Sequence, residues 1–586
     1  APGLARREFD QGAAPADLPM ERMLLVLKRS PEQQTSLSKL LDDQQDPSSA
    51  SYHKWLTPEQ FGQQFGASNQ DIQSITAWLQ SHGLQVNQVT KGRTVIEFSG
   101  TAAQVQDAFH TQMRKFVVDG ESFWANAGNL QIPSALVPAI AGPWSLHSFR
   151  KKPQLSSTKQ KFEALYKPGA RPEFTGSNGA HALFPGDYSV IYNINPVYQN
   201  GINGTGTSIA IVARTNIDFT DPSEFWSISG VNDSSTIIDS NGPDPGLGSA
   251  DDQFEAVLDV SWAGAIAPVA LRHFVVSGST NSTDGVDLSE LYIVEHNLAD
   301  VMTESFGSCE GFFTQQEADG IASLAEQAAS QGITYIVSTG DSGASTCDRP
   351  SQSLATHPIS VNILAATPFN IAAGGTMFNE NGQNSTFWNT TNTSNLASAK
   401  TYIRENVWNE SCSTAQCGSN ANLSATGGGV STFFSKPSWQ TGVTGIPADG
   451  HRDIPDISLT AAGHDPYLLC FQRSCEPDAQ NLIHFFGVSG TSASAPSFAG
   501  IMALIVQKTG SRQGQANYVL YKLAAAQNYS QCNGSSTAGA PAAACTFHDI
   551  TVGNNAVPGQ TSQQYQSTVG YDPATGLGSP NVANLV

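Results

Sequence analysis

Short, almost continuously apolar runs in the segment after Thr207 constrain the fold more than any other feature of this sequence. Strands that are apolar on both sides are typical of parallel sheets buried on both faces. Between the runs lie segments whose apolar residues recur at helical spacing, as crossover connections require. The pattern therefore predicts an α/β domain with a parallel sheet. The runs are 208–213, 269–276, 299–305 and 334–340, and the helical segments are 253–263, 288–296 and 317–331.

The first 130 residues show a different order of elements. A strand precedes a helix whose N-cap is Ser30, and a second helix precedes two alternating strands, a third helix and a closing strand. Two such strand-and-helix groups predict a compact α+β sandwich of the ferredoxin-like kind. The helices are expected at 31–43, 68–84 and 102–109, and the strands at 21–29, 84–89, 94–98 and 112–118.

A basic segment separates these two parts. Residues 150–179 are rich in Pro, Ser, Gly and Lys and have little apolar periodicity. This composition predicts an exposed linker that proteases can reach. We therefore divide the chain into a ferredoxin-like domain (1–149), a basic linker (150–179) and an α/β domain (180–586).

The charge of the chain argues against nucleic acid as a partner. Lys and Arg number 29 against 50 Asp and Glu, which gives a formal net charge of −21 and not the basic surface that nucleic-acid binding requires. Residues 176–586 carry 11 basic and 34 acidic side chains. Repulsion among them would relax as carboxylates become protonated, so the imbalance indicates an acidic working environment or, alternatively, only a soluble surface.

The eight cysteines all lie after residue 300, and none forms a CxxC pair with zinc-ligand spacing. An even count with three close pairs predicts disulfides, and therefore an oxidising compartment outside the cytoplasm. The sequence has no run of about 18 apolar residues, so we expect no membrane span. The start, Ala1-Pro2-Gly3, has no apolar signal core, and we expect that an export signal has been removed or omitted. The close pairs are Cys412/Cys417, Cys470/Cys475 and Cys532/Cys545, and Cys309 would pair with Cys347 if all three form.

The sequence places a serine at the predicted start of a helix, where backbone N–H groups favour a nucleophile. The string GTSASAP at 490–496 leads into an apolar helical run at 497–508, so Ser492 is expected at a helix start. Backbone N–H groups at that position can assist a nucleophile. The alternative is a glycine-rich turn in which a serine caps the helix.

Three carboxylates occupy positions suited to catalysis. Glu255 and Asp259 are four residues apart within a predicted helix, so both point to one helix face, and the residues around them are apolar. Asp341 follows the apolar run 334–340 and is expected at the carboxyl edge of the sheet, where ligands bind. The alternatives are a solvated helix face and an ordinary turn aspartate.

Taken in order, three motifs resemble those of the sedolisin family, the serine-carboxyl peptidases: ExxxD at 255–259, SxGDSG at 338–343 and GTSAxAP at 490–496. GTSxxxP is the nucleophile motif of subtilisin-like folds. A subtilisin proper would place its histidine in an HGTH-type segment, and none of the histidines after residue 176 stands in that context. The resemblance implies a subtilisin-like parallel sheet for the α/β domain.

The resemblance extends to the N-terminal part. Residues 46–61 resemble the DPxSxxYHxxLTPxxF signature of the family's activation propeptide, and 426–431 and 452–458 resemble segments of its catalytic core. This implies a proenzyme in which 1–149 is the activation propeptide, 150–179 contains the processing site and 180–586 is the catalytic domain.

The resemblance also implies the roles of four residues. Ser492 would be the nucleophile, Glu255 the base that takes its proton, Asp259 the group that holds Glu255, and Asp341 a protonated donor to the oxyanion. A glutamate, with an ordinary pKa of about 4.3, can still act as a base in acid, where a histidine with a pKa of about 6.5 is protonated. An acidic optimum is therefore expected.

Two C-terminal segments, 547–555 and 570–578, resemble the family's calcium site, which implies one structural Ca²⁺ ion. Asp549 and Asp572 would supply carboxylates, and Ile550 and Gly570 would supply carbonyls, in agreement with the preference of calcium for oxygen ligands. The chain has Thr568 where relatives usually have glycine, so its carbonyl can bind only if threonine adopts the required backbone angles.

We therefore expect a secreted, monomeric serine-type endopeptidase that acts on proteins or peptides and is inhibited by its own propeptide, with no nucleic-acid or membrane partner. A tripeptidyl exopeptidase activity stays open. Two rival interpretations are an ordinary Ser/His/Asp peptidase and a secreted binding protein that has lost turnover. Retention of all four candidate groups argues against the second rival.

Overall fold

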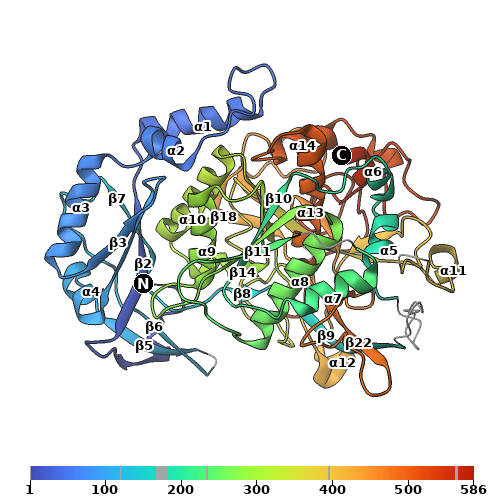
Figure 1. The fold of residues 1–586 in the computed structure, drawn as a ribbon, viewed down its shortest axis with the longest axis horizontal. Coiled ribbons are helices and arrows are strands. Elements are labelled where there is room, and N and C mark those ends of the chain that lie inside the picture. The colour runs from blue at the N-terminus through green and yellow to red at the C-terminus, as the bar shows by residue number, and fades with distance from the viewer. Residues whose placement is uncertain (1, 119, 166–180, 232–234, 394–395, 561–564) are drawn as a thin grey trace.

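The computed structural model describes residues 2–118, 120–165, 181–231, 235–393, 396–560 and 565–586. Figure 1 shows a smaller N-terminal unit, drawn in blue, beside a larger C-terminal unit that contains the central sheet. We call residues 2–149 the N-terminal unit, 150–165 the connecting segment and 181–586 the C-terminal unit. None of the helices in the described ranges is both long and apolar enough to cross a membrane.

The N-terminal unit contains a four-stranded antiparallel sheet in the order β3-β4-β2-β7. Helices α1, α2 and α4 begin with capping boxes at Ser30, Thr57 and Thr101, which satisfy their first backbone N–H groups. This is the predicted ferredoxin-like arrangement. Its elements are β2 (Pro19–Leu27), α1 (Pro31–Gln45), α2 (Pro58–Phe65), α3 (Asn69–Ser81), β3 (Gln85–Val89), β4 (Val95–Thr101), α4 (Ala102–Phe109) and β7 (Ile140–Ser145).

The strand predicted at 112–118 exists but does not close this sheet. As β5 (Met113–Val118) it pairs with β1 (Asp10–Ala13) and β6 (Glu121–Asn126) in a separate three-stranded sheet. The closing strand is β7, which contains Gly142 and Pro143, two residue types with low strand propensity. The prediction was therefore wrong here, because main-chain pairing with β2 outweighs the propensity of β7.

The C-terminal unit is built on an eight-stranded sheet whose order is β11-β12-β10-β13-β15-β16-β17, with β20 also paired to β16. All pairs are parallel except β16 with β17. The four predicted runs correspond to β10, β12, β13 and β15. The strands are β10 (Ser208–Ala213), β11 (Thr236–Ser240), β12 (Leu271–Val276), β13 (Val301–Glu304), β15 (Thr334–Ser338), β16 (Ile371–Phe378), β17 (Glu405–Val407) and β20 (Ile457–Thr460).

Helices cover both faces of this sheet. Along β10, Ile209 and Ile211 pack with α8 (Ala250–Ile266) and α13 (Thr491–Thr509), whereas Ala210 and Val212 pack with the opposite layer. This alternation follows from the two-residue period of a strand. The opposite layer contains α9 (Gly285–His296) and α10 (Gln315–Ser330). The predicted α/β fold, apolar on both sheet faces, is confirmed.

The connecting segment lies along the C-terminal unit. Its strand β8 (Lys152–Pro153) pairs with β14 (Phe306–Gly307), and β9 (Ser156–Leu165) pairs with β22 (Leu482–Ser489), both antiparallel. The expectation of a linker without regular structure is wrong for residues 152–153 and 156–165, because main-chain pairing, which composition does not reveal, holds them in strands. Residues 166–179 of the predicted linker lie outside the described residues.

The four disulfides in the C-terminal unit join the cysteines as the spacing predicted. The three close pairs form, and Cys309 is bonded to Cys347. No cysteine is free. The bonded pairs are Cys309–Cys347, Cys412–Cys417, Cys470–Cys475 and Cys532–Cys545.

Candidate active site

Ser492 is the second residue of α13, directly after the turn that follows β22. Gly490 makes this turn possible, since its φ is +119°. A Cβ at Gly490 would lie 2.2 Å from Oδ2 of Asp341 and 2.9 Å from the carbonyl oxygen of Gln154. The turn therefore requires glycine, and it brings these two groups to one point beside Ser492.

The hydroxyl of Ser492 donates a hydrogen bond to Oε2 of Glu255 over 2.9 Å. Its other recorded contact is with the carbonyl oxygen of Ser305, at 3.3 Å. Glu255 is fully buried in α8. Among the described residues, the hydroxyl has no histidine partner, so the base available to it is a carboxylate.

Asp259 lies one turn further along α8 and is also fully buried. Ser305 lies between Asp259 and the nucleophile: its hydroxyl is 2.7 Å from Oδ1 of Asp259 and 3.3 Å from the carbonyl oxygen of Ser492. That carbonyl needs an outside donor because Pro496, four residues on, has no N–H. Within the described residues, Glu255 and Asp259 have no direct hydrogen bond, and each has one oxygen without a partner.

Burial and mutual repulsion raise the pKa of Glu255 well above its ordinary value, with Asp259 as the principal charged cause and Asp341 as a weaker one. Burial also raises the pKa of Asp259, against the hydrogen bond from Ser305. Two carboxyls in one dry site cannot both ionise at low cost. Ionisation of one carboxyl of the Glu255–Asp259 pair therefore disfavours ionisation of the other.

Asp341 is held at the carboxyl edge of the sheet, three residues after β15. Its Oδ1 accepts hydrogen bonds from the backbone N–H and the hydroxyl of Thr491, at 2.8 and 2.9 Å. Its Oδ2 is buried and has no partner in the part of the chain that the structure describes. Burial raises the pKa of Asp341 to about 8, so in acid this oxygen carries a proton that it can donate.

Gln154 of the connecting segment occupies the centre of the site, which the sequence did not predict. Its carbonyl oxygen accepts a hydrogen bond from the backbone N–H of Ser492, at 3.0 Å, and its own N–H donates to the carbonyl of Ser305, at 2.9 Å. Strands β8 and β9 hold the chain on either side of it. The Gln154–Leu155 peptide bond therefore lies beside the nucleophile, between β8 and β9.

Hydrogen bonds join four of the five predicted calcium ligands in two pairs, and Ile550 follows Asp549 in the chain. Gly570 donates its N–H to Oδ1 of Asp549 at 3.0 Å, and Thr568 donates to Oδ2 of Asp572 at 3.3 Å. Both carboxylates are 1% exposed, and Oδ2 of Asp549 has no partner among the described residues. Thr568 does not have a positive φ, so it accommodates the backbone without strain. The carbonyls of Ile550, Thr568 and Gly570 accept no hydrogen bond from any described backbone N–H.

This set of groups fits a calcium ion. Two carboxylates and three carbonyls supply oxygen ligands, and water can complete the minimum of six. Buried carboxylates without a cation are costly, and no basic side chain of the described residues forms an ion pair with Asp549 or Asp572.

Comparisons with known proteins agree with the fold. The family model for the pro-kumamolisin activation domain matches residues 9–149. Xanthomonalisin of Xanthomonas sp. is 28% identical over 98% of this chain and 66% of its own length, sedolisin of Pseudomonas sp. is 28% identical over 96% and 86%, and kumamolisin of Bacillus sp. is 27% identical over 90% and 84%. The chain thus spans slightly less than two thirds of xanthomonalisin.

A solved structure of Pseudomonas sedolisin, a serine-carboxyl proteinase complexed with pseudo-iodotyrostatin, superposes with a TM-score of 0.53 at 26% identity, over 69% of this chain and 97% of that one. Residues 9–149 thus match an activation domain, and the C-terminal unit has a fold similar to that of a serine-carboxyl proteinase. Over nearly its whole length, the chain is similar to members of the sedolisin family.

The turn at Gly490 gives the first prediction. Gly490→Ala places a methyl group against Asp341 and imposes a positive φ, so it should lower the melting temperature more than the control Gly442→Ala. Gly442 has a φ of +81° but nothing within 4 Å of its Cβ position, so the control carries only the backbone cost of about 1–2 kcal/mol. Calorimetry of both variants measures the difference; equal melting temperatures would contradict the close approach.

Proposed function

We propose that this protein is a secreted, acid-acting serine-carboxyl endopeptidase that is made as a proenzyme and cleaves proteins or peptides. One observation carries the proposal. A serine hydroxyl is hydrogen-bonded to the buried carboxyl of Glu255, while the backbone N–H of the same serine holds the carbonyl of Gln154. A nucleophile, its base and a bound peptide carbonyl thus meet at one point, as acyl transfer requires.

In this mechanism, Oγ of Ser492 attacks the carbonyl carbon and its proton passes to Glu255. The oxyanion receives hydrogen bonds from the backbone N–H of Ser492 and from the protonated carboxyl of Asp341. Glu255 then returns the proton to the leaving amine, and water hydrolyses the acyl-enzyme by the same route. Asp259 keeps a second carboxyl beside the base. When the pair holds one proton and that proton is on Asp259, Glu255 is ionised and can accept the proton of Ser492.

The position of the connecting segment supports two parts of the proposal: inhibition by the propeptide, and cleavage within a polypeptide chain. With Gln154 at the reacting position, the cleft holds residues 151–153 before the bond and 156–165 after it. A peptidase restricted to tripeptides would need a free amino terminus three residues before the bond. Accommodation of Lys151 at the fourth position therefore supports endopeptidase action, and the uncut segment excludes other substrates.

Acid favours release of this segment. Burial raises the pKa of Asp287 to about 7, although its ion pair with Lys151 lowers it. When Lys151 leaves, that lowering is lost, so the pKa of Asp287 rises further and release takes up protons. Linkage then requires that release becomes more favourable as the pH falls toward about 7, with no further gain from this group at lower pH.

Four disulfides support a secreted protein, since such bonds persist outside the reducing cytoplasm. We also propose one structural calcium ion at Asp549, Ile550, Thr568, Gly570 and Asp572. Bound there, it would neutralise the two buried carboxylates and fix the C-terminal loops.

The activity itself is tested by hydrolysis of a denatured protein from pH 2 to 9 after acid treatment. Hydrolysis should be greatest in acid and disappear as the pH rises through about 8, because Asp341 then loses the proton that it donates. Ser492→Ala and Glu255→Gln should each lower the rate by about 10³-fold or more, and Asp341→Ala by about 10²–10³-fold.

Asp251→Asn is the matched control for these variants, since Asp251 lies in the first turn of α8 but is exposed. It should retain full activity. An alkaline or flat pH profile, or an active Glu255→Gln variant, would exclude the serine-carboxyl mechanism.

The calcium site is tested by thermal unfolding. A chelator should lower the melting temperature by several degrees, and added Ca²⁺ should restore it, because an ion that binds only the folded state stabilises that state. Asp549→Asn should abolish the response, whereas Asp319→Asn, at an exposed position of α10, should keep it. A melting temperature that does not respond to chelator or calcium would contradict the proposed calcium site.

A further inference from the structure

We propose that the C-terminal unit contains a subsite that selects a lysine side chain at the fourth position before the bond it cleaves. The inference rests on the function proposed above, because it takes the carbonyl of Gln154 as the group that Ser492 attacks. Counting back from Gln154, the fourth position is Lys151.

The register of the connecting segment is fixed by main-chain contacts. Ser492 and Ser305 bind the carbonyl and the N–H of Gln154. On the side before the bond, Pro153 lies opposite Phe306 and Lys152 opposite Gly307. A peptide bound in the same antiparallel way would place its own fourth residue where Lys151 lies.

The side chain of Lys151 is inserted into the C-terminal unit. It is 7% exposed, and its ammonium group forms an ion pair with Oδ1 of Asp287, itself 6% exposed. Asp287 lies in α9, and Glu290, one turn further, adds attraction for the same ammonium group. Neighbouring Lys152 is exposed instead. Because Lys151 is buried and Lys152 is exposed, the pocket receives the side chain at the fourth position and not the one at the third.

The main chain of Lys151 is held as well. Its N–H donates to Oδ2 of Asp284 at 2.8 Å, and its carbonyl accepts from Nη1 of Arg214 at 2.7 Å. Arg214 is oriented by Asp252, whose Oδ1 accepts from Nη2 at 2.6 Å. The N–H, the carbonyl and the ammonium group of Lys151 therefore each have a partner in the C-terminal unit.

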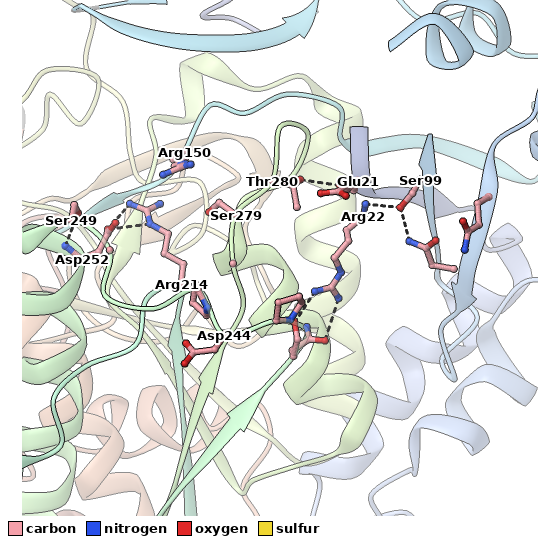
Figure 2. A pocket seen from close by; sticks show the side chains of 17 residues that line it. Glu21, Arg22, Ser99, Arg150, Arg214, Asp244, Ser249, Asp252, Ser279 and Thr280 are labelled. Carbon is pink, nitrogen blue, oxygen red and sulfur yellow. Dashed lines mark hydrogen bonds and ion pairs between the residues drawn. The ribbon is translucent and has the colours of Figure 1, made fainter. Parts of the chain in front are cut away.

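A cavity of about 700 Å³ lies beside Arg214 and Asp252, between the two units. Figure 2 shows Arg214 turned toward Asp252 on the side formed by the C-terminal unit, with Arg22 and Ser99 of the N-terminal unit opposite. The groups that hold Lys151 therefore belong to the C-terminal unit and stay when the N-terminal unit leaves.

Departure of Lys151 leaves a buried acidic pocket without its cation. When Asp287 is ionised, loss of its buried partner is strongly unfavourable, because the carboxylate then stays desolvated and uncompensated or must take up a proton. A substrate lysine that enters the same pocket restores the partner. Recognition of the propeptide and selection of substrate thus use the same residues.

The test uses the acid-activated full chain and a peptide with the sequence of residues 149–160, FRKKPQLSSTKQ. Replacement K151M in the peptide should lower kcat/KM for cleavage after Gln154 at least tenfold, whereas K152M, the matched control, should change it less than threefold. An Asp287→Leu enzyme keeps the branching of the side chain without its oxygens, and it should prefer the K151M peptide over the parent.

Each other outcome overturns the inference in a recognisable way. Equal kcat/KM for the parent and K151M peptides would contradict the subsite but not the proposed peptidase activity. Cleavage at a different bond would have the same meaning. Absence of cleavage that depends on Ser492 would overturn the proposed function together with the subsite. The comparison of kcat/KM for the parent and K151M peptides on the unaltered enzyme tests the subsite even if the Asp287→Leu enzyme does not fold.

Discussion

The close packing of α8 against α13 is the constraint on which the rest of the structure depends. Gly500 makes it possible, since a Cβ at this position would lie 2.6 Å from Cβ of Ile266. With the helices this close, Glu255 reaches the hydroxyl of Ser492 at 2.9 Å while it stays fully buried. Both helices bury their other faces in one apolar cluster with the central sheet, so neither can move without loss of core packing.

Burial of this kind determines the chemistry. Desolvation raises the pKa values of Glu255, Asp259 and Asp341, so protonated carboxyls are available for the proposed mechanism. The same dry site explains the fit of the connecting segment. Gln154 meets the main-chain groups that would otherwise be unsatisfied, and the ammonium group of Lys151 neutralises an acidic pocket nearby.

Much of the fold and the candidate site could be predicted from the sequence. The apolar runs gave β10, β12, β13 and β15, and the motifs brought Ser492, Glu255 and Asp341 into one site as expected. These features succeed because strong hydrophobic patterns and short motifs are local in sequence.

Features held by main-chain pairing could not be predicted. Strand β7 contains Gly142 and Pro143, and the connecting segment is polar, yet both are bound by backbone hydrogen bonds to distant strands. Ser305 was also missed as a residue of the site. Its signal was indirect: Pro496 cannot donate to the carbonyl of Ser492, so another donor was required, and the end of an apolar run at the sheet edge could supply it.

The most direct measurement is the amino-terminal sequence of the first fragment that appears when the intact chain is brought to acid pH. The account predicts a fragment that begins at Leu155, formed by cleavage of the bond that lies beside Ser492, and no such fragment from the Ser492→Ala chain. Early fragments that begin elsewhere, while the Gln154–Leu155 bond stays intact, would contradict it.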